Sequence, residues 1–213
     1  MNKIIQQTKE FVKIEFATDS TGHDWHHMER VWKNAKQLAK LENVGDPFII
    51  EMGALLHDIL DVKRSNAENN KTRFNKFLTN LPISNDKKKK IIDIIQSISY
   101  NGGHEKNIEL MEAKIVRDAD RLDALGAIGI ARTFAYGGAK GQLIYDPTIL
   151  RRTEISELDY RNGVTTSINH FYEKLLKLKD LMLTESGKKL AAERHKFLVL
   201  YLEQFYKEWN GEG

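Results

Sequence analysis

Apolar residues recur every three or four positions along most of the chain, which is the spacing of an amphipathic helix. The spacing is clearest at Val31, Ala35, Leu38, Leu41, Ile168, Phe171, Leu175, Leu178 and Leu181. No clear run shows the strict alternation of polar and apolar residues that is typical of a strand. The pattern therefore predicts an all-α fold. We expect helices near residues 2–18, 24–42, 47–60, 70–80, 85–99, 107–135, 157–183 and 186–209.

Residues that cap helix N-termini stand before several of these segments. Asp24, Asp46, Ser84 and Thr184 each precede a periodic apolar run, and Pro47 takes the first helical position after Asp46. Their side-chain oxygens can accept hydrogen bonds from N–H groups of the first turn, which have no partner within the helix. We therefore expect helices to begin close to these positions.

Three stretches interrupt the helical pattern, at residues 61–70, 101–103 and 137–153. The last is the longest, and it contains three glycines and a proline. Loops of this length in a compact domain are commonly functional. We therefore expect the loop at 137–153 to be a candidate lid.

Length and composition favour a soluble protein with one domain. The 213 residues are enough for a sizeable core, and 41% hydrophobic with 30% charged residues excludes a disordered chain and a membrane bundle. The net charge of +3 comes from interspersed charges, so it indicates neither nucleic acid nor a membrane as partner. No segment has the apolar length of a membrane span or the apolar core of a signal peptide, and we expect a cytoplasmic protein.

The chain contains no cysteine, which excludes disulfides, thiolate nucleophiles and cysteine-bound metal clusters. Any metal must therefore be held by histidines and carboxylates. Such residues cluster in three places: the segment 22–27 with three histidines, His57-Asp58 with Asp61, and the segment 118–123 with three aspartates. Clusters of this kind favour a metal hypothesis.

The surroundings of these clusters strengthen the hypothesis. The His57-Asp58 pair follows an apolar segment, and Asp118 and Asp120 lie among apolar residues. A buried charge is costly unless it is paired or bound to a cation. From the residue types alone two interpretations stay open: a bound metal, or aspartates paired with Arg117 and Arg121 beside ordinary hydrogen-bonded histidines.

The order and spacing of these residues resemble the H…HD…D signature of the HD-domain superfamily of metal-dependent phosphohydrolases. The likeness spans roughly residues 22–194 and is strongest to the small single-domain bacterial HD hydrolases. It is carried by His27-x-x-Arg30-Val31, Leu55-Leu56-His57-Asp58, Asp118-Ala119-Asp120-Arg121-Leu122-Asp123-Ala124-Leu125-Gly126 and His170-Phe171-Tyr172-x-Lys174-Leu175. The resemblance implies a single-domain HD-type helical bundle over 1–213. Its metal-site core would lie at about 22–135, with the C-terminal helices at 157–209 packing on that core.

The resemblance also implies that His27, His57, Asp58 and Asp120 bind a divalent metal ion. Two imidazoles and two carboxylates suit an octahedral ion and leave two positions for a water and a phosphate oxygen. A tetrahedral zinc would be filled by the same four ligands. We therefore expect Mn²⁺ first, with Mg²⁺, Co²⁺, Ni²⁺ and Fe²⁺ as alternatives.

Three residues near these ligands are candidates for other roles. Asp61 would share a face with His57 and Asp58 if the helix continued, which makes it a candidate general base or orienting group; a solvated aspartate at a helix end is the alternative. Arg30 and Lys63 are candidate contacts for substrate phosphates. For Arg30, a salt bridge to a carboxylate of the metal site is the alternative.

The function that the resemblance implies is hydrolysis of a nucleotide, with a (deoxy)nucleoside triphosphate giving monophosphate and pyrophosphate. The alternatives are a hydrolase of cyclic nucleotides or other phosphomonoesters and phosphodiesters, a non-catalytic nucleotide sensor, and a helical interaction domain with a structural His/Asp cluster. We expect a small phosphorylated molecule as partner, and neither nucleic acid nor a membrane.

The last helix carries an aromatic stripe, most simply interpreted as core, and a homodimer stays open. The stripe consists of Phe197, Tyr201, Phe205 and Trp209.

Overall fold

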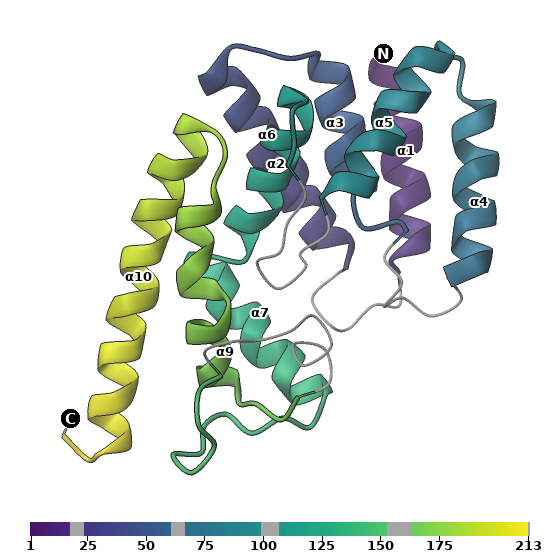
Figure 1. Cartoon of the computed structure of the whole chain (residues 1–213). Coiled ribbons are helices and arrows are strands. Elements are labelled where there is room, and N and C mark those ends of the chain that lie inside the picture. The colour runs from purple at the N-terminus through teal and green to yellow at the C-terminus, as the bar shows by residue number, and fades with distance from the viewer. Residues whose placement is uncertain (18–23, 61–66, 99–106, 153–162, 213) are drawn as a thin grey trace. The chain divides into compact units, whose positions relative to one another are not determined.

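The computed structural model describes residues 1–17, 24–60, 67–98, 107–152 and 163–212 (Figure 1). In these ranges all regular structure is helical, which confirms the all-α prediction. The elements are α1 (Asn2–Glu15), α2 (Trp25–Glu42), α3 (Pro47–Leu56), α4 (Ala67–Asn80), α5 (Asn85–Ser97), α6 (Met111–Asp123), α7 (Gly126–Ala139), α9 (Ser167–Glu173), the 3-10 helix η1 (Leu175–Leu181) and α10 (Glu185–Trp209). None of the helices described is both long and apolar enough to cross a membrane. Of the predicted interruptions, 101–103 and most of 61–70 lie outside the described residues.

The described chain divides into two compact units, the first running from α1 to Asp120 and the second from Arg121 onward. A single domain over 1–213 stays a prediction. In the first unit, α3 is the central helix, and α1, α2 and α5 pack on it. A helix that is apolar on all sides is stable only when other elements enclose it. The buried residues of α3 are Phe48, Ile49, Ile50, Met52, Gly53, Ala54, Leu55 and Leu56.

The N-terminus of α3 is fastened to two other helices through Asp46. One carboxylate oxygen of Asp46 accepts hydrogen bonds from the backbone N–H groups of Phe48 (2.9 Å) and Ile49 (3.4 Å), as the sequence predicts for a cap. The other oxygen accepts a hydrogen bond from Lys87 of α5 at 2.8 Å. The backbone N–H of Asp46 donates to Glu112 of α6 at 2.9 Å. The starting point of α3 is therefore fixed relative to α5 and α6.

The helix expected over 107–135 is two helices, α6 and α7. Leu125 has an extended backbone, and Gly126 has a φ of +69°. This left-handed conformation breaks the ladder of hydrogen bonds within the helix, and glycine adopts it without the steric cost that other residues meet. Apolar residues keep their helical spacing across the break, which is why the pattern alone did not reveal it.

The expected loop at 137–153 begins later, because α7 continues to Ala139. Residues 140–152 are hydrogen-bonded to α9 and the residues before it. The backbone N–H groups of Ser167 and Ile168 donate to the carbonyls of Leu143 and Ile144, each at 3.0 Å. At the end of the loop, Arg152 forms an ion pair with Glu173. These bonds tie residues 140–152 to α9, and the role of the loop as a lid stays a prediction.

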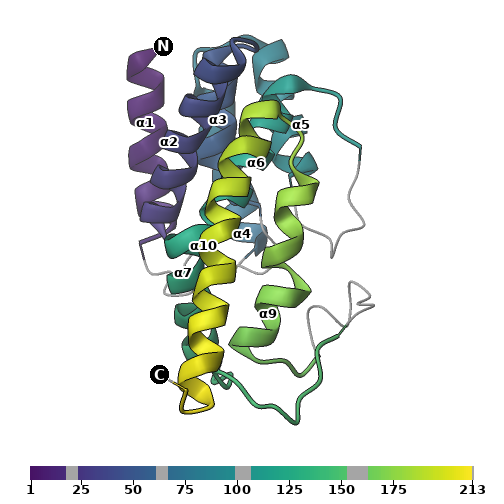
Figure 2. The same ribbon diagram turned by 90° about the vertical axis from the view of Figure 1, so that its left-hand side faces the viewer.

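In the second unit, α9 and η1 run alongside α10 in the opposite chain direction (Figure 2). Of the single helix expected near 157–183, residues 157–162 lie outside the described residues, and the rest contains α9 and η1, which are divided where the backbone of Lys174 departs from helical angles. α10 buries Gly187, Ala191, Leu198 and Leu202. The aromatic stripe is therefore not all core: the exposed fraction is 48% for Phe197 and 50% for Trp209.

Gly53→Ala in α3 is expected to destabilise the protein, although alanine is the better helix former. A Cβ at position 53 would lie 2.9 Å from Cγ2 of Ile94 on α5 and 3.4 Å from Cγ2 of Val116 on α6. Overpacking of this kind should lower the free energy of unfolding by about 1–3 kcal/mol, measured by urea denaturation followed by circular dichroism.

Gly138→Ala in α7 is the matched control, because a Cβ there meets nothing within 4 Å. This substitution should raise the free energy of unfolding by up to about 1 kcal/mol. Stabilisation by both substitutions would show that α3 and α5 are not closely packed at Gly53.

Glu173→Gln is expected to remove a pH-dependent part of the stability. Burial raises the pKa of Glu173, but hydrogen bonds from Arg152 and Thr165 outweigh it and hold that pKa below 4.5. The stabilisation from the pair is therefore present above pH 4.5 and is lost as the pH falls through the lower, folded-state pKa. The melting temperatures of the wild type and the variant should differ at pH 7 and converge in acid. The exposed Glu203→Gln on α10 should show no such convergence.

Candidate metal centre

His27 is placed by the cap of α2. The Asp24 carboxylate accepts a hydrogen bond from the backbone N–H of His27 at 2.9 Å, so Asp24 is the N-cap and His27 lies in the first helical turn. The position at which a helix begins determines the direction in which each later side chain points. His27 is completely buried.

His57 and Asp58 follow directly after the last residue of α3. Nδ1 of His57 lies 2.9 Å from the carbonyl oxygen of Ala54, one of the carbonyls that a helix C-terminus leaves without a partner in the helix. A carbonyl can only accept, so Nδ1 donates, and in the neutral ring Nε2 then carries the lone pair. A hydrogen bond of this kind fixes the orientation of a metal-binding imidazole.

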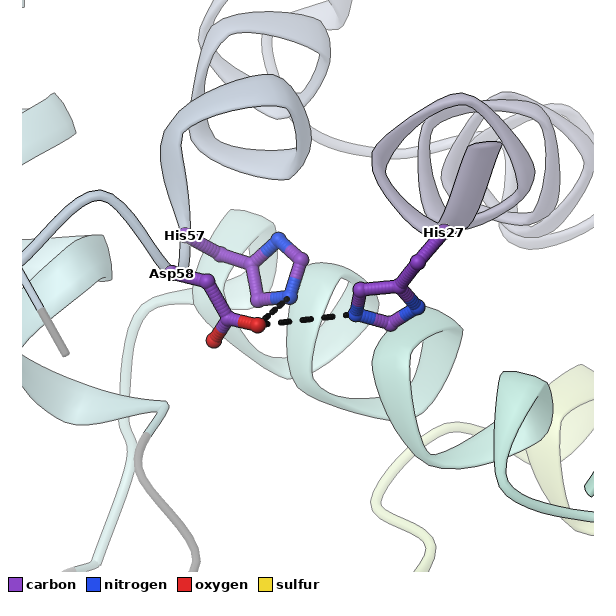
Figure 3. A group of neighbouring side chains, drawn as sticks. All are labelled: His27, His57 and Asp58. Atoms are coloured by element: carbon purple, nitrogen blue, oxygen red, sulfur yellow. Dashed lines mark ion pairs between the residues drawn. The ribbon is translucent and has the colours of Figure 1, made fainter. Parts of the chain in front are cut away.

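The two imidazoles point toward one another from α2 and from the end of α3, with the Asp58 carboxylate beside both (Figure 3). Oδ2 of Asp58 is 3.4 Å from Nε2 of His57 and 3.5 Å from Nε2 of His27. Oδ1 of Asp120, on α6, is 3.6 Å and 3.5 Å from the same two nitrogens. The donor atoms of His27, His57 and Asp58 lie within 4.8 Å of one another and form a possible metal site.

These residues fit a metal ion by geometry and by chemistry. Atoms that share an ion at bond lengths of about 2.1 Å lie about 3–4 Å apart, the range found between the carboxylates and the imidazoles. Nε2 of His57 is buried and makes no hydrogen bond within the described residues. A nitrogen that faces two carboxylates can be satisfied by a metal ion between them or by a proton. HD domains bind divalent metals, which agrees with this donor set.

The electrostatics of the cluster favour positive charge. Burial lowers the pKa of His57, but Asp58 and Asp120 outweigh it and raise that pKa well above 6.5. Burial raises the pKa of Asp120, but His57 and His27 outweigh it and bring that pKa below 3.8. Both shifts have one cause, namely that the carboxylates are close enough to the rings to stabilise a cation there.

The two arginines considered as alternative partners for the aspartates have contacts of their own. Asp118, which is buried, acts on Arg117, whose pKa burial lowers and Asp118 raises. Arg121 donates a hydrogen bond to the carbonyl of Leu181 at 2.6 Å. Asp58 and Asp120 face the two histidines instead.

Of the candidate residues for other roles, the structure describes Arg30 but not Asp61 or Lys63. Arg30 lies on α2, one turn after His27, and is half-buried. Asp61 and Lys63 lie outside the described residues, so their roles stay predictions. His26, the neighbour of His27, is exposed.

Two contacts near the cluster were not predicted from the sequence. The first is the Ala54 carbonyl, a backbone group that no pattern of side chains could reveal. The second is a hydrogen bond from Nδ2 of Asn34 on α2 to the carbonyl of Ala119 on α6, at 3.2 Å. Asn34 lies two turns after His27 on the same face of α2, beside the buried Val31 and Ala35, a signal that could have pointed to it.

The chain is similar in sequence and fold to known proteins that carry an HD domain. The HD domain family matches residues 24–125, a range that contains His27, His57, Asp58 and Asp120. The uncharacterized protein YpgQ of Bacillus subtilis is 34% identical over 98% of this chain and 95% of its own length. A crystal structure of YpgQ in complex with ADP covers 98% of this chain and all of its own, with a TM-score of 0.74.

Two further crystal structures are similar over nearly the full length. A Lactobacillus plantarum protein is 34% identical, with a TM-score of 0.89 and 99% of each chain covered. An HD-superfamily hydrolase from Bacillus thuringiensis is 45% identical, with a TM-score of 0.76 and 98% of each chain covered. With this likeness and the matched domain, the chain belongs to the HD domain family.

Proposed function

We propose that this chain is a metal-dependent phosphohydrolase that converts a (deoxy)nucleoside triphosphate into the monophosphate and pyrophosphate. The observation that carries the proposal is the meeting of His27, His57, Asp58 and Asp120, with donor atoms 3.4–3.6 Å apart, in a family whose members include hydrolases. The ADP complex of YpgQ supports a nucleotide as the substrate.

In this proposal the four residues hold one divalent ion, with Mn²⁺ favoured. The ion, when bound, supplies Lewis acidity that stabilises charge on phosphoryl oxygens and makes water more acidic. The Nδ1 hydrogen bond to Ala54 keeps the His57 ring oriented toward that position. The side chains of Asp58 and Asp120 are 20% and 32% exposed, whereas those of both histidines are fully buried, so a substrate would approach from the carboxylate side.

Three other residues complete the proposal. The Arg30 guanidinium would bind substrate phosphate oxygens, because its planar donors match them in pairs. It lies one turn from His27 on the same helix, which supports that role. Lys63 would add a second phosphate contact, and Asp61 would accept the proton of the attacking water.

Metal-stripped protein should release no pyrophosphate from ribo- or deoxynucleoside triphosphates. Release should begin when Mn²⁺, Mg²⁺, Co²⁺ or Ni²⁺ is added. The measurement follows pyrophosphate and orthophosphate separately over a panel of nucleotides. Orthophosphate alone would move the reaction to another phosphate bond. Tight nucleotide binding without turnover under every metal would instead support the nucleotide sensor.

His57→Ala and Asp58→Ala should each lose metal and turnover together and remain folded. Each substitution removes a donor atom of the cluster, and loss of metal affinity should exceed about 10-fold. Metal content after dialysis and hydrolysis rates provide the two measurements, and far-UV circular dichroism reports folding. His26→Ala, which removes an exposed imidazole from α2, is the control and should keep both properties. Retained metal-dependent turnover in both site variants would overturn the assignment.

A further inference from the structure

We propose that Asn34 is a positioning residue that holds α6 in register so that Asp120 reaches the metal site. The inference rests on the proposed function only in taking Asp120 as a metal ligand. It starts from the hydrogen bond that Nδ2 of Asn34 donates to the carbonyl oxygen of Ala119 at 3.2 Å.

Asn34 and His27 contact successive residues of α6. Asn34 lies seven residues after His27, which is two helical turns, so both side chains leave α2 on the same side. Asn34 binds the backbone of Ala119, and Nε2 of His27 lies 3.5 Å from the carboxylate of the next residue, Asp120. The hydrogen bond therefore fixes α6 at the residue that precedes the proposed ligand.

Close to Asp120, apolar packing alone would not fix this register, and the contact of α6 with Asp46 through Glu112 lies two turns earlier in the helix. Val31 and Ala35 flank Asn34 on α2, and both are completely buried, as is Ala119. Contacts between small apolar groups are not directional, so they resist a slide of one helix along another only weakly. A shift of one residue moves a helix by about 1.5 Å. A displacement of that size would change the contact of Asp120 with both imidazoles, whereas a hydrogen bond to a carbonyl opposes it directly.

The chemistry of the amide suits this role. A carbonyl oxygen needs a donor, which the Asn34 amide supplies and which an aspartate at the same position would lack. The ligands at the end of α3 have contacts of their own: His57 is oriented through Ala54, and Asp46 caps α3 and accepts a hydrogen bond from Lys87 of α5. Loss of the Asn34 amide should therefore affect the contribution of Asp120 and leave that of Asp58 unchanged.

The first test measures Ni²⁺ affinity of the full chain by isothermal titration calorimetry. Ni²⁺ is the probe because it binds such sites more tightly than Mn²⁺, so weakened variants stay measurable. Asn34→Leu should weaken Ni²⁺ binding about 10-fold, the lower end of the effect of residues that orient metal ligands. Gln37→Leu, the same change at an exposed position of α2, is the matched control and should bind like the wild type.

The decisive test is a double-mutant cycle. If Asn34 acts through Asp120, Asn34→Leu should cause no further loss of Ni²⁺ affinity in the Asp120→Ala variant. In the Asp58→Ala variant it should still cause the full loss of about 10-fold. A merely structural role would weaken binding in both variants or lower only the melting temperature. Equal losses in both variants, or no loss in the wild type, would overturn the proposal.

Two further variants keep the test independent of folding and of activity. Asn34→Asp should behave like Asn34→Leu, whereas Asn34→Gln, which retains the amide donor, should recover part of the affinity. If the leucine variant does not fold by circular dichroism, Asn34→Ala takes its place in the cycle. Failure of wild-type protein to hydrolyse any nucleotide would overturn the proposed function, and the Ni²⁺ cycle would still decide the role of Asn34.

Discussion

The enclosure of α3 is the constraint on which the candidate centre depends. This helix is apolar on nearly all sides and packs against α1, α2 and α5, so its end cannot lie in bulk water. His57 and Asp58 follow at that end, where isolated charge would be costly. A cation shared by two imidazoles and two carboxylates would offset this cost. His57 and Asp58 therefore affect both the chemistry of the candidate site and the stability of the core.

Much of the fold could be predicted because it follows from local rules. Helical spacing of apolar residues predicts most of the helices, and Asp24, Asp46, Ser84 and Thr184 cap them as expected. The break at Gly126 could not be predicted, because its positive φ reflects the path of the chain and not the apolar pattern. The partial exposure of Phe197 and Trp209 likewise depends on which face of α10 finds neighbours.

The candidate site, like the fold, has features that the sequence predicts and features that it does not. Donor types, their order and their spacing are written in the sequence, and the family resemblance selected His27 over its exposed neighbour His26. The Asp24 cap that orients His27 can be predicted, whereas the contacts that orient His57 and hold α6 cannot, because they involve the backbone carbonyls of Ala54 and Ala119. These groups are present at every residue, and only the folded chain decides which of them meets a donor.

The Asp24 cap makes the direction of the His27 side chain less dependent on the number of residues that precede Asp24. Its carboxylate binds the backbone N–H of His27, so the cap helps to set the rotational phase of α2 only three residues before the ligand. Insertions or deletions ahead of Asp24 would then change the connection without turning the imidazole. A redesigned connection that still presents Asp24 to the first turn of α2 should therefore keep the direction of His27.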